Sequence, residues 1–227
     1  MVVCNGCSCG TWWYYIVGYG LGMRGVVYDW FGLNVWLFHF INNIHFAIFD
    51  QIMLLGTTIG SYKLVGFYMI LLFVSSFIGV KIQDGGKFNK QTILFWFTPI
   101  AVFGIAFLID AAFLSFLKPF LDLPRPLLAL PLGSVHVVGI AEYHHSFPSG
   151  HSSFAMLLVA SIWPLLKGWQ KWIGVSFVLW VGISRISVGA HFPADVLGGF
   201  ISSLIIVLLV KQLLSFISRK IESQKKL

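Results

Sequence analysis

Three polar clusters, each beside a long apolar run, hold the residues of this 227-residue chain that are suited to chemistry. They read K-x6-R-P, P-S-G-H and S-R-x5-H-x3-D, and their members are Lys118, Arg125, Pro126, Pro148, Ser149, Gly150, His151, Ser184, Arg185, His191 and Asp195. Charged side chains beside membrane-length apolar runs are costly unless they serve a function. Together the clusters offer three cations, two histidines and one carboxylate. This inventory suits binding a phosphate group and breaking one of its bonds.

The histidines and the carboxylate predict nucleophilic chemistry. His191 and Asp195 are four residues apart at the start of an expected helix. The carboxylate can therefore hold one ring nitrogen and make the other a better nucleophile. His151 is then free to act as general acid toward the leaving oxygen. A lone histidine at a membrane interface is usually structural, whereas two histidines facing three cations rarely are.

The remaining cluster residues are predicted to bind phosphate. A helix that begins at Ser149 would offer free backbone N–H groups to an anion, and Gly150 would let the backbone approach it closely. Arg125 and Arg185 carry planar forks that match phosphate oxygens, while Lys118 acts as a point charge. The alternatives are ordinary helix capping by Ser149 and snorkelling of Lys118 to the membrane surface.

Four further polar residues have two interpretations each. Asp110 either balances the charge of the pocket or is an interfacial carboxylate near a helix end. His136, His144 and His145, in the loop Leu127–Phe147, are either surface residues or substrate contacts. Because the neighbours of the cluster histidines are cations, which would repel a metal ion, we expect neither a catalytic metal nor another cofactor.

The composition indicates an integral membrane protein. The chain is 58% hydrophobic and 10% charged, with a mean hydropathy of +0.87, whereas a soluble domain carries about 25% charged residues. Its net charge of +7 arises mostly from residues between apolar runs. That pattern favours orientation in the membrane over nucleic-acid binding. The sequence does not specify an oligomeric state.

The apolar runs predict an all-α polytopic fold of about six transmembrane helices in one bundle. Residues 11–28 are expected to form a first helix and residues 30–50 an amphipathic helix in the membrane interface. The later runs are 64–80, 92–117, 152–166, 172–183 and 196–217. We expect a single domain, 1–227, made of an N-terminal segment 1–60, a catalytic bundle 61–217 and a cytoplasmic tail 218–227.

The N-terminal cysteines do not suggest a disulfide framework. Cys4, Cys7 and Cys9 are odd in number and clustered, and a poorly ordered N-terminal segment is favoured over metal binding or lipidation.

The alternation of spans places all three clusters on one side of the membrane. The first cluster follows one run, the second opens the next, and the third lies between the last two. The opposite side receives a set of basic residues: Lys81, Lys87, Lys90, Lys167, Lys171, Arg219, Lys220, Lys225 and Lys226. Positive residues mark the cytoplasmic side. The clusters are therefore expected to face away from the cytoplasm.

The ordered set of clusters resembles the three-part signature of the type 2 phosphatidic acid phosphatase superfamily, and every motif position matches. The first 60 residues match nothing specific. The resemblance implies a six-helix membrane enzyme that works through a phosphohistidine and needs no divalent metal. It implies that His191 is the nucleophile, Asp195 its orienting carboxylate and His151 the proton donor. The implied phosphate-binding residues are Lys118, Arg125, Ser149, Gly150 and Arg185.

Two function classes remain beside a lipid phosphatase. A vanadate-binding haloperoxidase shares the signature, but such proteins are soluble, and the mean hydropathy argues against it. A phosphate- or lipid-binding transporter would place charged groups near the bilayer midplane, whereas these lie at helix ends. The favoured function is hydrolysis of a lipid phosphate or diphosphate at the non-cytoplasmic face. Candidate lipids are polyprenyl diphosphate, phosphatidylglycerol phosphate, phosphatidic acid and lipid A phosphates.

Overall fold

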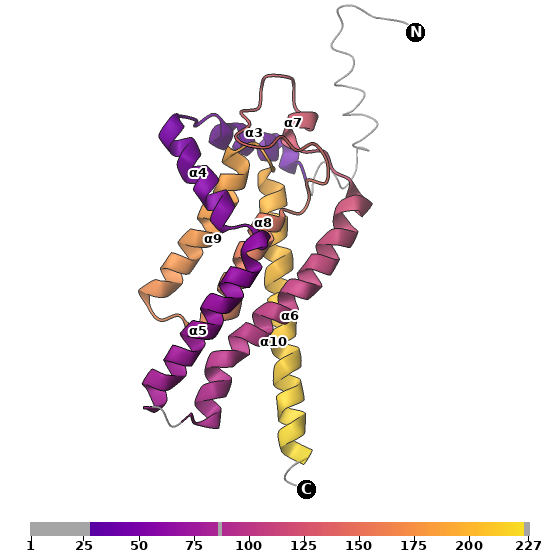
Figure 1. The fold of residues 1–227 in the computed structure, drawn as a ribbon. Coiled ribbons are helices and arrows are strands. Elements are labelled where there is room, and N and C mark those ends of the chain that lie inside the picture. The colour runs from indigo at the N-terminus through magenta and orange to yellow at the C-terminus, as the bar shows by residue number, and fades with distance from the viewer. Residues whose placement is uncertain (1–27, 86–87, 225–227) are drawn as a thin grey trace, which may run out of the picture.

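A computed structural model describes residues 28–85 and 88–224, which form helices joined by loops (Figure 1). Within this part of the chain there is no strand, and the predicted all-α fold is confirmed. The elements are η1 (Trp30–Gly32), α3 (Leu33–Asn42), α4 (Ala47–Ile59), η2 (Tyr62–Leu64), α5 (Val65–Asp84), α6 (Lys90–Leu121), α7 (Pro126–Ala129), α8 (Gly150–Ile162), η3 (Trp163–Leu165), α9 (Trp169–Ser187) and α10 (Pro193–Gln224).

The longest helices have the length and composition of membrane spans. Three apolar helical stretches, Tyr62–Asp84, Lys90–Ala129 and Pro193–Ile221, are long enough to cross a bilayer. Their outward side chains are large and apolar, as expected of a surface that faces lipid. The chain is therefore an integral membrane protein. The total of six spans stays a prediction, because the expected helix 11–28 lies outside the described residues apart from Tyr28.

Helix α8 lies inside the bundle, in contact with α6, α9 and α10. Most of its side chains are buried, so this short helix is covered by protein along much of its surface. Helix α10 approaches the first turn of α8 very closely. A Cβ atom added at Gly199 would lie 2.5 Å from the backbone oxygen of Ser149 and 3.1 Å from the backbone nitrogen of Ser153. Glycine is therefore required where α10 crosses the start of α8.

Residues 30–50 do not form the single interfacial helix that we predicted. Helix α3 ends at Asn42, the backbone of Phe46 is extended, and α4 runs from Ala47 to Ile59. The side-chain amide of Asn42 donates to the backbone oxygens of His136 (2.8 Å) and Ser187 (2.9 Å). These bonds hold the end of α3 against the loop and against α9, and asparagine is a weak helix former.

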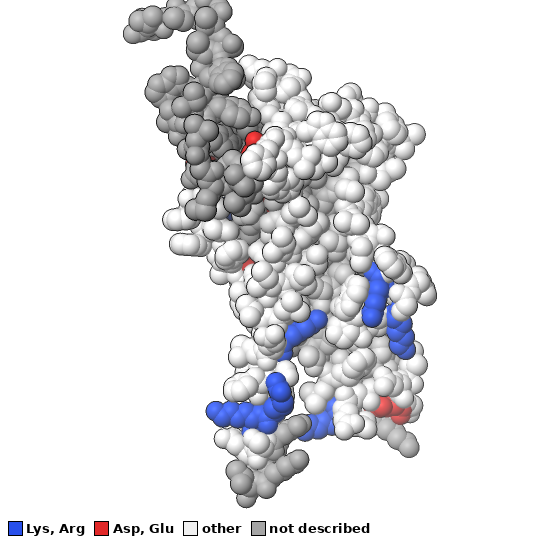
Figure 2. All heavy atoms as spheres, turned by 180° about the vertical axis from the view of Figure 1, so that it is seen from behind, with Lys and Arg blue, Asp and Glu red and all other residues white. Residues whose placement is uncertain are grey.

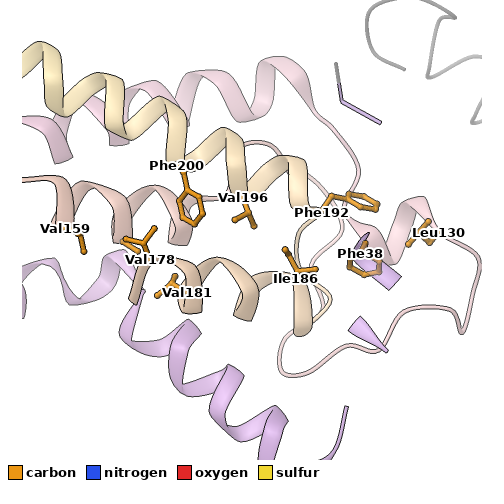
Figure 3. Close-up of a cluster of buried hydrophobic side chains, with 10 residues drawn as sticks. Phe38, Leu130, Val159, Val178, Val181, Ile186, Phe192, Val196 and Phe200 are labelled. Atoms are coloured by element: carbon orange, nitrogen blue, oxygen red, sulfur yellow. The ribbon is translucent and has the colours of Figure 1, made fainter. Parts of the chain in front are cut away.

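The inward face of α3 supports the turn between α9 and α10. Asn34, Phe38 and Asn42, spaced four residues apart on this face, are buried. The rings of Phe38 and Phe192 lie 5.3 Å apart between centroids, within an apolar cluster that also contains side chains of α8, α9 and α10 (Figure 3). Asn34 Oδ1 accepts a hydrogen bond of 2.9 Å from the backbone nitrogen of Ala194. Helix α3 thus fixes the beginning of α10.

We expect Gly199→Ala to destabilise the protein. The added methyl group would meet backbone atoms of α8, which cannot move aside as a flexible side chain does. Overpacking of this kind costs about 1–3 kcal/mol, and thermal unfolding in detergent should show a lower Tm.

Gly66→Ala in α5 is the matched control for this substitution. A Cβ atom at Gly66 meets nothing within 4 Å, and alanine favours a helix over glycine by about 0.5–1 kcal/mol, so its Tm should be equal or higher. A Gly199→Ala protein as stable as the wild type would contradict the close crossing of α8 and α10.

Candidate active site at one end of the bundle

The three sequence clusters meet at one end of the bundle. Lys118 lies in the last turn of α6 and Arg185 in the last turn of α9. Ser149 is the N-cap of α8, and its backbone nitrogen donates to the backbone oxygen of Asp195 (2.9 Å) in the first turn of α10. In Figure 1 these helix ends lie in the upper part, near α3 and α7.

His191 is buried between a carboxylate and a guanidinium. Its Nδ1 lies 3.4 Å from Asp195 Oδ2, and its Nε2 lies 3.2 Å from Arg125 Nη1. A guanidinium only donates hydrogen bonds, so Nε2 accepts and the ring proton lies on Nδ1, facing Asp195. Burial holds the pKa of His191 well below its ordinary value, and the charge of Arg125 lowers this pKa further. The imidazole is therefore neutral at neutral pH, with the lone pair of Nε2 directed at Arg125.

Asp195 is held in place by three donors besides His191. Tyr28 donates its hydroxyl to Oδ1 (2.7 Å). Oδ2 accepts from the hydroxyl of Ser146 (2.5 Å) and from the backbone nitrogen of Phe192 (2.8 Å). The carboxylate is fully buried, so these bonds compensate for its lost hydration and fix its orientation toward the imidazole. Sequence reasoning missed Tyr28 and Ser146, which belong to no motif.

Two of the cations bind backbone oxygens of the loop that precedes α8. Arg125 Nε donates to the backbone oxygen of His144 (2.9 Å), and Lys118 Nζ donates to that of His145 (3.4 Å). Arg125 Nη1 also donates to the backbone oxygen of Ala190 (3.2 Å). The loop is therefore held over the site by the same side chains that carry its positive charge.

Glu142 places its carboxylate between the two arginines. Its Oε2 forms an ion pair with Arg125 Nη1 and lies 3.6 Å from Arg185 Nη2. The arginine side chains are 9% and 8% exposed, whereas that of Glu142 is 45% exposed. Glu142 was not predicted to belong to the site, although it is the single carboxylate between residues 127 and 147. An acid alone in the loop between cationic motifs was the signal that could have identified it.

A cavity of about 490 Å³ opens beside this cluster. His151, Arg185 and Glu142 line one part of it, and the junction of α4 and α5 lines another. The lining residues from that junction include Thr57, Thr58, Ser61 and Lys63. Sequence reasoning assigned none of these, because the segment carries no motif.

Ser149 and Asp110 contact polar side chains of α8. Ser149 Oγ accepts hydrogen bonds from the backbone nitrogen (3.5 Å) and the hydroxyl (2.9 Å) of Ser152. Asp110 is buried in α6 and accepts a hydrogen bond of 2.7 Å from Ser153 Oγ. The first contact is the capping geometry that the sequence left as an alternative for Ser149. The second joins α6 to α8.

The loop histidines pair with carboxylates of their own. His136 Nε2 lies 3.2 Å from Asp50 Oδ2. The Nδ1 atoms of His144 and His145 lie 3.5 Å and 3.2 Å from Asp122 Oδ1. No group of three or more His, Cys, Asp or Glu side chains in residues 28–85 and 88–224 is arranged to hold a metal ion.

Comparisons with known proteins identify a family and relatives that this chain resembles. The family model described as the PAP2 superfamily matches residues 97–219. Undecaprenyl-diphosphatase BcrC of Bacillus subtilis is 31% identical over 179 residues, which cover 77% of this chain and 80% of that protein. Phosphatidylglycerophosphatase B of Bacillus subtilis is 42% identical over 107 residues, 42% of this chain and 48% of that protein.

A solved structure shares the fold. The crystal structure of Aquifex aeolicus LpxE is 26% identical and aligns with a TM-score of 0.63, covering 79% of this chain and 95% of that chain. The family match spans all three polar clusters, from Lys118 to Asp195.

Removal of the Glu142 charge should expose the arginine pair to other anions. We expect Glu142→Gln to bind inorganic phosphate at least about tenfold more tightly than the wild type, since a hydrogen bond to a charged group contributes about 1.5–3 kcal/mol. Isothermal titration calorimetry of the purified protein measures this Kd directly.

Asp122→Asn serves as the control for the phosphate titration. Asp122 is the exposed C-cap residue of α6, and its partners are His144 and His145 in the loop that carries Glu142. Its replacement should leave the Kd for phosphate within about twofold of the wild type. Unchanged affinity in Glu142→Gln would show that the carboxylate does not compete for the anion site.

Proposed function

This chain belongs to the PAP2 superfamily, and from that premise we propose that it is a lipid phosphate phosphatase that hydrolyses a phosphate ester or anhydride through a phosphohistidine. One observation carries the proposal most directly. His191 has Nδ1 directed at Asp195 and the lone pair of Nε2 directed at Arg125. This is the geometry that a nucleophilic imidazole needs beside a bound phosphate.

In the first step, Nε2 of His191 attacks phosphorus. The bond between phosphorus and the leaving oxygen breaks, its electron pair stays on that oxygen, and His151 supplies the proton. Arg125 exchanges its contact with Nε2 for one with a phosphate oxygen, and Arg185 and Lys118 neutralise further negative charge. The first backbone N–H groups of α8, at Gly150 and beyond, provide donors at the positive end of the helix dipole.

In the second step, water hydrolyses the phosphohistidine. His151, which lost its proton in the first step, accepts one from the attacking water. The bond between phosphorus and Nε2 breaks, its electron pair returns to His191, and inorganic phosphate is released. Asp195 stabilises the positive charge on the phosphorylated ring, and its three other donors keep it aligned throughout. Glu142 then returns to the arginines.

The depressed pKa of His191 keeps this mechanism available in mild acid. A protonated imidazole has no lone pair on Nε2, and the folded-state pKa lies well below the ordinary value. Attack by His191 is therefore lost only as the pH falls through that lower pKa. The low pKa also means that the charged ring is disfavoured in the folded state.

A transporter without hydrolysis is not favoured. Its charged groups would lie near the bilayer midplane, whereas these lie at the ends of α6, α8, α9 and α10. The substrate is a lipid that carries phosphate or diphosphate, as the names of the Bacillus subtilis relatives suggest.

The site is proposed to face away from the cytoplasm, in a bacterial inner membrane. Lysines and arginines gather at the opposite end of the bundle, in the lower part of Figure 2. Lys81, Lys90, Lys167, Lys171 and Arg219 lie near helix ends in this region. Positive residues flanking spans remain in the cytoplasm, which supports this orientation.

We expect His191→Ala to lower kcat for phosphate release by at least about 10³-fold, because it removes the attacking atom. Acid quenching during turnover should trap acid-labile phosphate on the wild type and none on the variant. His39→Ala, on α3 outside the cluster, should retain both activity and trapped phosphate. Substantial activity in a folded His191→Ala protein would refute the proposed nucleophile.

Cysteine labelling in intact cells tests the orientation. With Cys4, Cys7 and Cys9 replaced by serine, an impermeant maleimide should modify Leu132→Cys and Ile140→Cys, which lie in the exposed loop beside the site. It should spare Lys81→Cys and Trp169→Cys until the cells are opened. The reverse pattern would place the site in the cytoplasm.

A further inference from the structure

The cavity beside the site contains a further cation that the mechanism above does not use. Lys63 belongs to η2, at the junction of α4 and α5, and lines the same cavity as His151, Arg185 and Glu142. Its side chain is exposed. None of the ion pairs formed within residues 28–85 and 88–224 involves Lys63. The ammonium group is therefore available to a ligand in this cavity.

Lys63 lies on the side of the site where the leaving group is expected. The ring of the preceding residue, Tyr62, packs edge-on against the ring of His151, with 6.3 Å between centroids. The pKa of His151 is lowered to about 3 by burial and by the charges of Arg185, Lys118, Arg125 and Lys63. His151 can therefore carry its proton near neutral pH only when the negative charge of a bound phosphate offsets these cations. Since His151 is the proposed donor to the leaving oxygen, Lys63 is next to whatever departs with that oxygen. Arg125, by contrast, contacts the nucleophile His191.

The charge of the leaving group distinguishes two kinds of substrate. A lipid monophosphate loses its lipid as an alcohol, which is neutral once His151 has protonated it. A lipid diphosphate loses its lipid as a monophosphate, which carries negative charge in the ground state and gains more as the bond breaks. A cation beside the leaving oxygen stabilises the second transition state and contributes little to the first.

We propose that Lys63, with the hydroxyl of Ser61 beside it, forms a second anion subsite that binds the phosphate retained by the lipid, and that the enzyme therefore prefers lipid diphosphates. This inference rests on the proposed phosphatase function. Ser61 lines the same cavity, and its Oγ accepts a hydrogen bond of 3.3 Å from the backbone nitrogen of Lys63. The hydroxyl hydrogen of Ser61 is thus left free to donate to a phosphate oxygen.

A lipid diphosphate bound at this subsite is cleaved between its terminal phosphorus and the bridging oxygen. His191 Nε2 bonds to the terminal phosphorus while the bond from that phosphorus to the bridging oxygen breaks. The electron pair stays on the bridging oxygen, which becomes an oxygen of the lipid monophosphate. His151 protonates it, and Lys63 holds the product until it leaves. Water then releases inorganic phosphate from His191.

A purely structural role for Lys63 is the competing explanation. Tyr62–Asp84 is long and apolar enough to span a membrane, and a lysine near the start of such a span can snorkel to the surface. Such a lysine would affect all substrates alike. The ratio of the activities on a diphosphate and a monophosphate of the same lipid therefore distinguishes a structural role of Lys63 from an anion-binding role.

The test compares phosphate release from farnesyl diphosphate and farnesyl monophosphate by the full chain in detergent. Lys63→Met should lose on the order of tenfold in kcat/KM on the diphosphate, the effect of one charge-assisted hydrogen bond, and stay within about twofold on the monophosphate. Lys63→Arg keeps the charge and should retain most of the diphosphate activity. Lys90→Met, at the start of α6 at the other end of the bundle, is the matched control and should change neither.

Three results would overturn the subsite. They are an equal loss on both substrates in Lys63→Met, no loss on either, and a loss in Lys63→Arg as large as that in Lys63→Met. Thermal unfolding of each variant distinguishes a folding defect from a binding defect. If Lys63→Met is unstable, Lys63→Arg still tests whether a positive charge at this position is sufficient for activity on the diphosphate. Release of phosphate from neither farnesyl substrate by the wild type would overturn the preference for lipid diphosphates, whereas the proposed function itself is tested by the His191→Ala comparison above.

Discussion

Compensation of buried positive charge is the constraint on which the rest of this structure depends. Arg125 and Arg185 are both buried at the end of a helix bundle, where an unpaired charge costs several kcal/mol. Glu142 lies against both arginines, and the backbone oxygens of His144 and Ala190 accept hydrogen bonds from Arg125. The buried Nε of Arg185 has no hydrogen-bond partner among the described residues. The loop before α8 is therefore held by the cations beneath it, and in the proposed mechanism a substrate anion would have to replace Glu142 as the partner of the two arginines.

The packing of the apolar helices fixes the positions of the helix ends that carry the polar residues. Helix α8 is enclosed by three neighbours, and the glycine contact at Gly199 brings α10 against its first turn. Helix α3 holds the turn at Phe192 and Ala194 from the other side. His191 and Asp195 thus lie on a scaffold whose parts come from both halves of the chain, which gives the imidazole one orientation.

The sequence allowed prediction of the clusters and of their meeting at one end, because alternation of spans is a geometric necessity. It did not predict the contacts of Tyr28, Ser146 or Lys63, which arise from tertiary placement of segments without motifs. Residues 30–50 showed the same limit. Their amphipathic pattern correctly indicated helix, but the hydrogen bonds of Asn42 to distant backbone atoms, invisible in the pattern, divide that helix in two.

The hydrogen bond between Tyr28 and Asp195 spans 167 positions of the chain, and that between Asn34 and Ala194 spans 160. Tyr28 and Asn34 can therefore form these hydrogen bonds only after residues 194 and 195 have been synthesised and have left the ribosome. A nascent chain that ends between His151 and Ser184 has the first two polar clusters but lacks His191 and its carboxylate partner. The buried carboxylate of Asp195 therefore gains Tyr28 as a partner only after the helices between them have been synthesised.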